Sequence, residues 1–574
     1  MSVNQALRSI RSSDSQKSRG FHFAAIGLLL FGALVRIVGF LQNASLSGDE
    51  AMLALSIGPR SFAELLQPLD YGQVAPVPFL WAERVMIMVG GVSGYTLRVI
   101  PLLTGIVLLW VVYRLGEKLL GKVDGLMALT LSATSFPLIR FSVEVKPYIL
   151  DALVSAVLVW VAVRLLDKLE DGWRWAWLAI TGAVGVLLSA PALLVCVALL
   201  TGLGIASVRR RRAQYLGRLG LLAGVWGAIF FAAYVSWYAA NAGAPYMRAF
   251  WAETFLRPGT PRFLPRLWHG LSELACTLTC WRGVVGLWPL LLLLALIGVV
   301  YLARRRGLEF AVFLGGPIAG AFGASALGSY PIATRLLLFS APLLAILVGS
   351  GAAVIARTLE SSWPSLRARW VLLLLVYPSV IPAAALAFVP QGDWGFHGEE
   401  VRPLAELYRD RGRNEPVYVF PRAVPAWVFH TTDWSTADSA RLSWVAQIAG
   451  PAGPGFVNGP SRGRRLPGDG SDLVYDRGGW NELYGTSTGA QGRMGVGYSP
   501  PEPDPGWAES EVWRIREAAK PYAWIVLSDY AHGRLDERAI LMRAVTAAGG
   551  QVVFTQAAPN AVLYRVLFHP LPIE

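Results

Sequence analysis

Long apolar runs recur from residue 21 to residue 389, and they constrain the fold of this chain more than any other feature. The first, FHFAAIGLLLFGALVRIVGFLQ at 21–42, is long enough to cross a bilayer as a helix. With 54% hydrophobic residues among 574, the sequence predicts a polytopic α-helical membrane protein. We expect about eleven membrane helices, at 21–42, 97–115, 123–140, 147–165, 174–189, 191–207, 218–239, 284–302, 308–327, 335–356 and 369–389.

Basic residues gather in every second connection between these runs. The connections are 114–122, 164–174, 209–218, 304–306 and 357–369, and the N-terminal stretch 1–20 is also basic. Because cytoplasmic loops are enriched in Lys and Arg, the N-terminus is predicted to be cytoplasmic. An odd number of spans then puts the chain after residue 390 outside, together with two outer segments at 43–96 and 240–283. The short run 76–91 is expected to lie near the membrane interface.

Composition excludes several other classes of protein. The net charge of +13 belongs to these loops and forms no basic stripe with interleaved aromatic residues, so no nucleic-acid partner is expected. Three cysteines exclude a disulfide scaffold and a four-cysteine metal site, and Cys276 and Cys280 are expected to be packing thiols. The histidines lack metal-ligand spacing, and no phosphate-binding glycine loop supports an ATP-driven mechanism.

From residue 391 the long apolar runs stop, and residues 391–574 are predicted to form a soluble α/β domain. Residues 1–390 would form the transmembrane domain. The Gly/Pro-rich stretch 450–506 is expected to be loop. The elements expected in the soluble domain are strands at 417–420, 522–528, 551–555 and 561–568 and a helix at 536–548.

Two acids, Asp49 and Glu50, follow the first apolar run and form the leading candidate site. A carboxylate at the mouth of a membrane helix is costly, so such a group is a functional candidate. After Gly48 the pattern becomes helical, which leaves two interpretations of Asp49. It either caps an interfacial helix that runs to about Gln67, or it is a general base for an acceptor hydroxyl.

The segment 69–85 lies in the same predicted outer loop as the acid pair. It holds Asp70, Tyr71, Gln73 and Glu83, with two prolines that bend the chain. These residues form either a structured turn with a solvated acid or a polar wall around an acceptor.

Two further groups of charged residues lie on the same predicted side. Arg140, Glu144 and Lys146 fall between the third and fourth apolar runs. They are either snorkelling charges with an internal salt bridge or a pocket in which Lys146 and Arg140 hold a phosphate. Arg335, at the outer end of the tenth run, is either an interface anchor or a phosphate clamp.

These segments, in this order, resemble the multispanning glycosyltransferases that use polyprenyl-phosphate sugars and share the C-type glycosyltransferase (GT-C) fold. The resemblance is to the group that contains protein O-mannosyltransferases and the aminoarabinose transferase of lipid A, and it covers residues 20–390. Protein O-mannosyltransferases carry a domain inserted between helices that this chain lacks, so a protein acceptor is in doubt. The matching segments are LSGDEAMLALSI (46–57), LDYGQVAPVPFLWAERV (69–85), YTLRVIPLLTGI (95–106), FSVEVKPYILDAL (141–153) and IATRLLLFSAPLLAIL (332–347).

The resemblance implies an inverting transferase that moves a sugar from a polyprenyl-phosphate donor to an acceptor on the extracytoplasmic face. Asp49 would be the catalytic acid–base group, and Glu50 would support it. Whether the acceptor is a glycan, a lipid or a protein stays open, as does a divalent cation near the donor phosphate. The donor phosphate would be held by Lys146, Arg140 and Arg335, and the cavity would be lined by Asp70, Tyr71, Gln73, Glu83, Glu144 and Tyr148.

Two alternatives to an enzyme are a membrane transporter or lipid flippase and a non-catalytic scaffold. Transporters place polar groups near the middle of the membrane, whereas the charges here gather at one face. A scaffold leaves that charge cluster unexplained. The Ala/Gly/Arg/Trp-rich composition suits a bacterial inner membrane, where membrane lipids would surround the helices.

Overall fold

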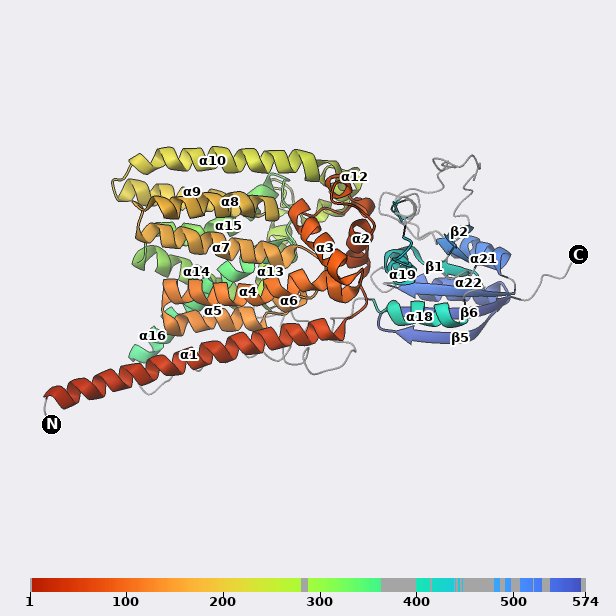
Figure 1. Ribbon diagram of the computed structural model, residues 1–574, viewed down its shortest axis with the longest axis horizontal. Helices are drawn as coiled ribbons and strands as arrows, with labels where there is room; N and C mark the ends of the chain where they lie inside the picture. Colours follow the sequence, from red (N-terminus) through yellow and green to blue (C-terminus); the bar gives the residue numbers. More distant parts are fainter. Residues whose placement is uncertain are drawn as a thin grey trace, which may run out of the picture.

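The computed structural model has two parts, a bundle of long helices and a six-stranded sheet (Figure 1). The expected domain boundary at residue 390 and the expected span 369–389 lie outside the residues that it describes. Those residues are 3–279, 288–362, 399–412, 415–437, 439, 442, 443, 446, 480–485, 491–496, 506–519, 521–528 and 537–568.

Eight helices of the described residues are long and apolar enough to cross a membrane, which confirms a polytopic helical fold. The shorter apolar helix α8 (Gly172–Leu188) lies among them (Figure 1). The expected count of about eleven spans is not confirmed. The eight spans are α1 (Val3–Gln42, apolar from Phe21), α4 (Gly94–Leu120), α7 (Tyr148–Asp167), α9 (Ala192–Arg209), α10 (Gln214–Ala233) with its continuation to Ala242, α14 (Trp288–Arg305), α15 (Leu308–Ala326), and α16 (Ala341–Ser362) with the turn Leu337–Ser340 before it.

The expected continuous helix at 123–140 is wrong, because the chain breaks at Ser135. It forms α5 (Lys122–Thr134) and α6 (Phe136–Arg140), and Ser135 has a non-helical ψ of 117°. Pro137 has no N–H to donate to the carbonyl of Ala133, so the helix cannot continue with its regular hydrogen bonds.

Arg36 of the neighbouring helix α1 donates hydrogen bonds to the backbone carbonyls at this break. Its guanidinium donates to the carbonyls of Ser132, at 3.2 Å, and Ala133, at 3.5 Å. The same side chain donates to Ser142 Oγ at 3.1 Å, beyond α6. Because unpaired carbonyls in apolar surroundings are costly, this fully buried arginine stabilises the bend that leads to residues 140–147.

The segments that follow α1 lie at the end of the bundle that faces the sheet (Figure 1). Helix α2 (Gly48–Ile57) ends ten residues before the expected Gln67, and α3 (Val77–Gly90) matches the expected interfacial run. Helix α12 (Pro245–Phe250) lies at the same end, whereas α13 (Phe263–Thr279) packs on α6 and α14 (Figure 1). Cys276 of α13 is disulfide-bonded, so the expectation that it is a packing thiol is wrong.

The C-terminal sheet has the strand order β2-β3-β1-β4-β6-β5. Its central strands β3, β1 and β4 run parallel and the others pair antiparallel. The strands predicted at 417–420, 522–528, 551–555 and 561–568 are confirmed, but the expected loop 450–506 is wrong where it contains β2 and β3. The strands are β1 (Val417–Val419), β2 (Trp480–Gly485), β3 (Gln491–Val496), β4 (Tyr522–Ser528), β5 (Gly550–Ala558) and β6 (Ala561–Phe568).

Four helices of the described residues accompany the sheet, and one of them packs on α2. They are α18 (Arg402–Arg411), α19 (Val424–Thr431), α21 (Trp507–Ala518) and α22 (Glu537–Ala547). Leu53 and Leu55 of α2 belong to the same buried hydrophobic cluster as Trp427 of α19. The membrane bundle and the sheet therefore share part of one core around α2, consistent with the place of α19 in Figure 1.

Helices α14 and α16 cross at close range through glycines. A Cβ atom at Gly298 would lie 2.0 Å from the carbonyl oxygen of Leu347, and one at Gly351 would lie 1.9 Å from that of Leu294. Small residues at a crossing let helix backbones approach closely inside a membrane.

We predict that Gly298→Ala lowers the free energy of unfolding of the detergent-solubilised protein by about 1–3 kcal/mol, because the backbones of α14 and α16 must separate. Thermal unfolding measures the change. Gly323→Ala is the matched control, since a Cβ atom there meets nothing within 4 Å. The control is expected to unfold at or above the wild-type temperature. Equal melting temperatures for the two variants would contradict the close crossing.

Candidate functional site

The first turn of α2 is capped by Ser47 and holds both acids, Asp49 and Glu50. Ser47 is the N-cap, and the Glu50 carboxylate accepts from the Ser47 backbone N–H at 3.1 Å. The interpretation of Asp49 as the N-cap is therefore wrong. Asp49 lies at the second helical position, and its side chain, 42% exposed, is left to contact another part of the chain.

That contact is Arg335, which lies almost three hundred residues away in the sequence. Arg335 Nη1 donates to Asp49 Oδ2 at 2.5 Å. The Arg335 guanidinium also lies over the ring of Trp251, 5.0 Å from its centroid. An arginine that is held by a carboxylate on one side and an aromatic face on the other has a defined position. Its side chain keeps 29% exposure, so a further anion can reach it.

Lys146 adds a second positive charge beside Asp49. Its ammonium group is buried and donates to Gln73 Oε1 at 2.7 Å. The charge of Lys146 holds the pKa of Asp49 below its usual range, and Arg335 and Arg140 act in the same direction although burial opposes them. Burial lowers the pKa of Lys146 itself. Asp49 is therefore an ionised carboxylate at neutral pH.

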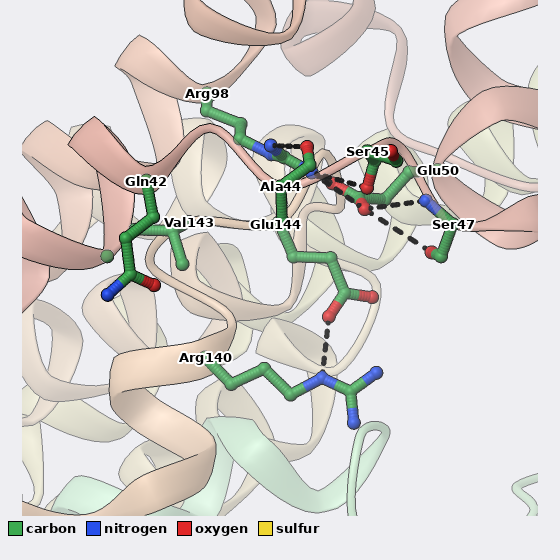
Figure 2. Close-up of a pocket in the computed structure, with 10 residues that line it drawn as sticks. Gln42, Ala44, Ser45, Ser47, Glu50, Arg98, Arg140, Val143 and Glu144 are labelled. Atoms are coloured by element: carbon green, nitrogen blue, oxygen red, sulfur yellow. Dashed lines mark hydrogen bonds and ion pairs between the residues drawn. The ribbon is translucent and has the colours of Figure 1, made fainter. Parts of the chain in front are cut away.

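Arg140 and Glu144 form an ion pair at the edge of a neighbouring pocket (Figure 2). Arg140 Nε donates to Glu144 Oε2 at 3.0 Å. Burial raises the pKa of Glu144, and Arg140 counteracts the rise. Arg140 is 41% exposed, so it can reorient toward solvent or a ligand. The pocket is lined by Gly39, Gln42, Ala44, Ser45, Ser47, Glu50, Arg98, Arg140, Val143 and Glu144.

Glu50 lies on the buried side of α2, next to Arg98 and Val145. Its carboxylate accepts from Arg98 Nη2 at 2.9 Å and from the backbone N–H of Val145 at 2.9 Å. Both members of the Glu50–Arg98 pair are about 95% buried. The pair thus ties α2 to α4 and to the segment that carries Lys146. Sequence analysis missed Arg98, although its place in the first turn of a predicted span was a usable signal.

The polar residues of segment 69–85 do not line one common cavity wall but contact different parts of the chain. Gln73 joins the site through Lys146. Asp70 instead pairs with Arg60 at 3.0 Å and accepts from Ser443 Oγ at 2.8 Å, so it faces the C-terminal part. Tyr71 is buried in the turn with a positive φ of 55°.

Asn241, which sequence analysis missed, holds the same turn from the end of the α10 span. Its side chain donates to the carbonyls of Leu69, at 3.0 Å, and Gln73, at 2.8 Å. The position of Gln73 beside Lys146 therefore depends on a residue far along the chain.

Two other expected cavity residues differ in their surroundings. Tyr148 begins α7, packs edge-on against Phe141 and lies near Arg335. Glu83 is fully buried, and neither carboxyl oxygen has a hydrogen-bond partner within the described part of the chain. Burial among the side chains of α3 raises the pKa of Glu83 well above its usual range.

The structure thus brings Asp49, Arg335, Lys146 and Gln73 together from four separate segments, and Arg140, Glu144 and Tyr148 lie near this group. Among the described residues, no group of three or more His, Cys, Asp or Glu side chains could hold a metal ion.

Residues 74–237 match the model of a protein family described as dolichyl-phosphate-mannose-protein mannosyltransferase. This match confirms, over that segment, the resemblance to glycosyltransferases that use polyprenyl-phosphate sugars. No curated protein sequence matches the chain.

Solved structures of the same broad class are similar at low identity. The oligosaccharyltransferase AglB from Archaeoglobus fulgidus, in complex with an inhibitory peptide and a dolichol-phosphate, has a TM-score of 0.46 at 15% identity over 94% of this chain and 74% of that one. ArnT from Cupriavidus metallidurans bound to undecaprenyl phosphate has a TM-score of 0.42 at 13% identity over 93% and 97% of the two chains. Both TM-scores lie below 0.5, so neither likeness supports a mechanism for this chain.

We predict that Glu50→Gln destabilises the protein by about 3–5 kcal/mol, because it leaves Arg98 as a buried charge without a charged partner. Glu117→Gln is the control, since Glu117 pairs with the half-exposed Arg114 at a helix end and should cost at most about 1 kcal/mol. Thermal unfolding in detergent measures both. A wild-type melting temperature for Glu50→Gln would show that the pair does not anchor α2.

Proposed function

We propose that this protein is an inverting glycosyltransferase that moves a sugar from a polyprenyl-phosphate donor to an acceptor. The observation that carries the proposal is the Asp49 carboxylate in contact with Arg335 and under the charge of Lys146. One acid that stays ionised and two cations that can receive a phosphate are the groups that such a reaction needs. The family match over residues 74–237 supports the same class of reaction.

In this mechanism the acceptor hydroxyl binds at Asp49 and gives its proton to the carboxylate. The acceptor oxygen forms a bond to the anomeric carbon from the side opposite the phosphate. The bond between that carbon and the phosphate oxygen breaks, and its electron pair leaves with the polyprenyl phosphate. Arg335 and Lys146 stabilise the negative charge of the departing phosphate, so no acid is needed to protonate it.

Arg335 would change partners during this cycle. Without donor it is bonded to Asp49, and the monoanionic phosphodiester of the donor would compete with that carboxylate for the same guanidinium. Donor binding would then draw Arg335 away and release Asp49 toward the acceptor. The partial exposure of both side chains allows this exchange.

We place this chemistry on the extracytoplasmic side of a bacterial inner membrane. The basic loops support a cytoplasmic N-terminus. The disulfide-bonded Cys276 in α13 lies near the Arg335 segment, since Glu273 of that helix accepts from Thr334, and disulfides persist in oxidising compartments. The sheet domain would lie on the same side, next to α2.

The first test is Asp49→Asn, assayed with polyprenyl-phosphate sugars and with undecaprenyl phosphate as a binding probe. We expect turnover to fall by roughly 10²–10⁴ because the general base is lost. Undecaprenyl phosphate should bind more tightly, because Arg335 and Lys146 no longer face a carboxylate. Asp167→Asn, in an exposed ion pair with Lys118, is the control and should behave as wild type. Undiminished turnover in Asp49→Asn would remove this residue from the mechanism.

The second test uses the pH dependence of turnover. The pKa of Asp49 is lowered by Lys146, so the wild-type base stays ionised, and turnover persists, below the pH at which an ordinary Asp is protonated. In Lys146→Met the pKa of Asp49 rises, and the acidic limb of the kcat/KM profile moves to higher pH. Lys146→Arg keeps the charge and should keep the profile. Identical acidic limbs in all three proteins would show that Lys146 does not act on the base.

A further inference from the structure

We propose that Glu400, in the C-terminal part, is a positioning residue for Asp49 and acts through Ser45 and the start of α2. This inference rests on the proposed function of Asp49. It gives the C-terminal part a role in the geometry of the site.

The contact between Glu400 and Ser45 is a paired set of hydrogen bonds. Ser45 Oγ donates to Glu400 Oε2 at 2.7 Å, and the Ser45 backbone N–H donates to Glu400 Oε1 at 3.2 Å. Ser45 Oγ in turn accepts from the backbone N–H of Arg402 at 3.1 Å. Ser45 and Glu400 are both buried, so water competes poorly for these bonds.

The Glu400 segment is itself fixed to the sheet. The Glu400 backbone N–H donates to the carbonyl of Pro559, in the turn between β5 and β6, at 3.0 Å. The adjacent Glu399 accepts from Ser528 Oγ, at the end of β4, at 3.0 Å. Through Glu400 and Glu399, Ser45 is therefore held in a fixed position relative to strands β4, β5 and β6.

The membrane bundle holds the same loop from the other side. Arg98 of α4 donates to the carbonyl of Ala44 at 2.7 Å and to that of Ser45 at 3.4 Å, and it pairs with Glu50. Ser45 is thus bonded on one side to the bundle and on the other to Glu400. Only Leu46 separates Ser45 from Ser47, the N-cap of α2.

Because α2 is short, the position of Asp49 depends on the loop 44–47 that precedes the helix. The helix has ten residues, too few to be stable alone, so tertiary contacts set where its first turn lies. Asp49 is in that first turn, and a displacement of about 1 Å can cost roughly 10²-fold in rate. Helix α19 packs on the remainder of α2, so the Ser45 contacts and the Glu50–Arg98 pair together set the position of its first turn.

The test compares Glu400→Ala with Glu406→Ala, which removes an exposed carboxylate from α18 in the same part of the chain. For Glu400→Ala we expect kcat to fall about tenfold or more, with the KM for donor within about twofold of wild type. The acidic limb of the pH profile should also move to higher pH, because Asp49 shifts away from Lys146 and Arg335. Glu406→Ala should match wild type in every measurement.

A loss of folded enzyme would lower turnover without moving the pH profile, so the profile separates positioning from simple instability. Hydrogen exchange of the α2 amides in the donor-free protein adds a readout independent of activity, and Glu400→Ala should speed it about tenfold. Should Glu400→Ala fail to fold, Ser45→Ala removes the same 2.7 Å bond from the other side and should give the same changes.

A wild-type pH profile and wild-type α2 exchange in both Glu400→Ala and Ser45→Ala would overturn the inference. This failure is distinguishable from failure of the proposed function. If Asp49→Asn abolishes turnover while the Glu400 and Ser45 variants behave as wild type, the function stands and only the positioning role falls. If Asp49→Asn retains turnover, the mechanism falls, and faster α2 exchange in Glu400→Ala would report structure alone.

Discussion

The buried ion pair between Glu50 and Arg98 is the interaction on which the rest of the site depends. In surroundings of low polarity, each charge needs the other, and the pair is satisfied only when α2, α4 and the segment before α7 meet at one point. Its neighbour Asp49 is left facing Arg335 and Lys146 as a consequence. The two adjacent acids thus differ in their surroundings. Glu50 is buried against Arg98, whereas Asp49 is partly exposed and pairs with Arg335.

The bundle and most of the sheet could be predicted from sequence because both depend on local patterns. Runs of apolar residues and the β-branched strands around Val417 and Ile525 specify their own secondary structure. The breaks were harder to predict. Ser135 ends a helix in the middle of an apolar run, and the compensation comes from Arg36, about a hundred residues earlier. β2 and β3 have a glycine-rich sequence that reads as loop, and pairing across the sheet decides their conformation.

The site was predicted in part for the same reason. Asp49, Lys146 and Arg335 stood out because charge beside apolar runs is costly. Their pairing could not be read from the sequence, since Asp49 and Arg335 meet only in the folded chain. Asp70 and Glu83 looked alike as acids in one loop, yet one faces Arg60 and Ser443 and the other is buried in α3. Asn241 was missed because it bonds only to backbone carbonyls, which the sequence does not mark. Arg98 was missed because it bonds to a backbone carbonyl and to Glu50, and the expected role of Glu50 was to support Asp49.

The contact between Gly58 and Trp434 shows how closely the two parts of the chain depend on each other. A side chain at Gly58 would start 2.5 Å from the indole ring, so this aromatic residue fits only against a bare backbone at the end of α2. Deleting the C-terminal sheet would uncover the apolar surface of α2 that packs on α19 and expose it to water or to other chains. A change on either side of this contact would therefore also disturb the helix that carries the Asp49 carboxylate.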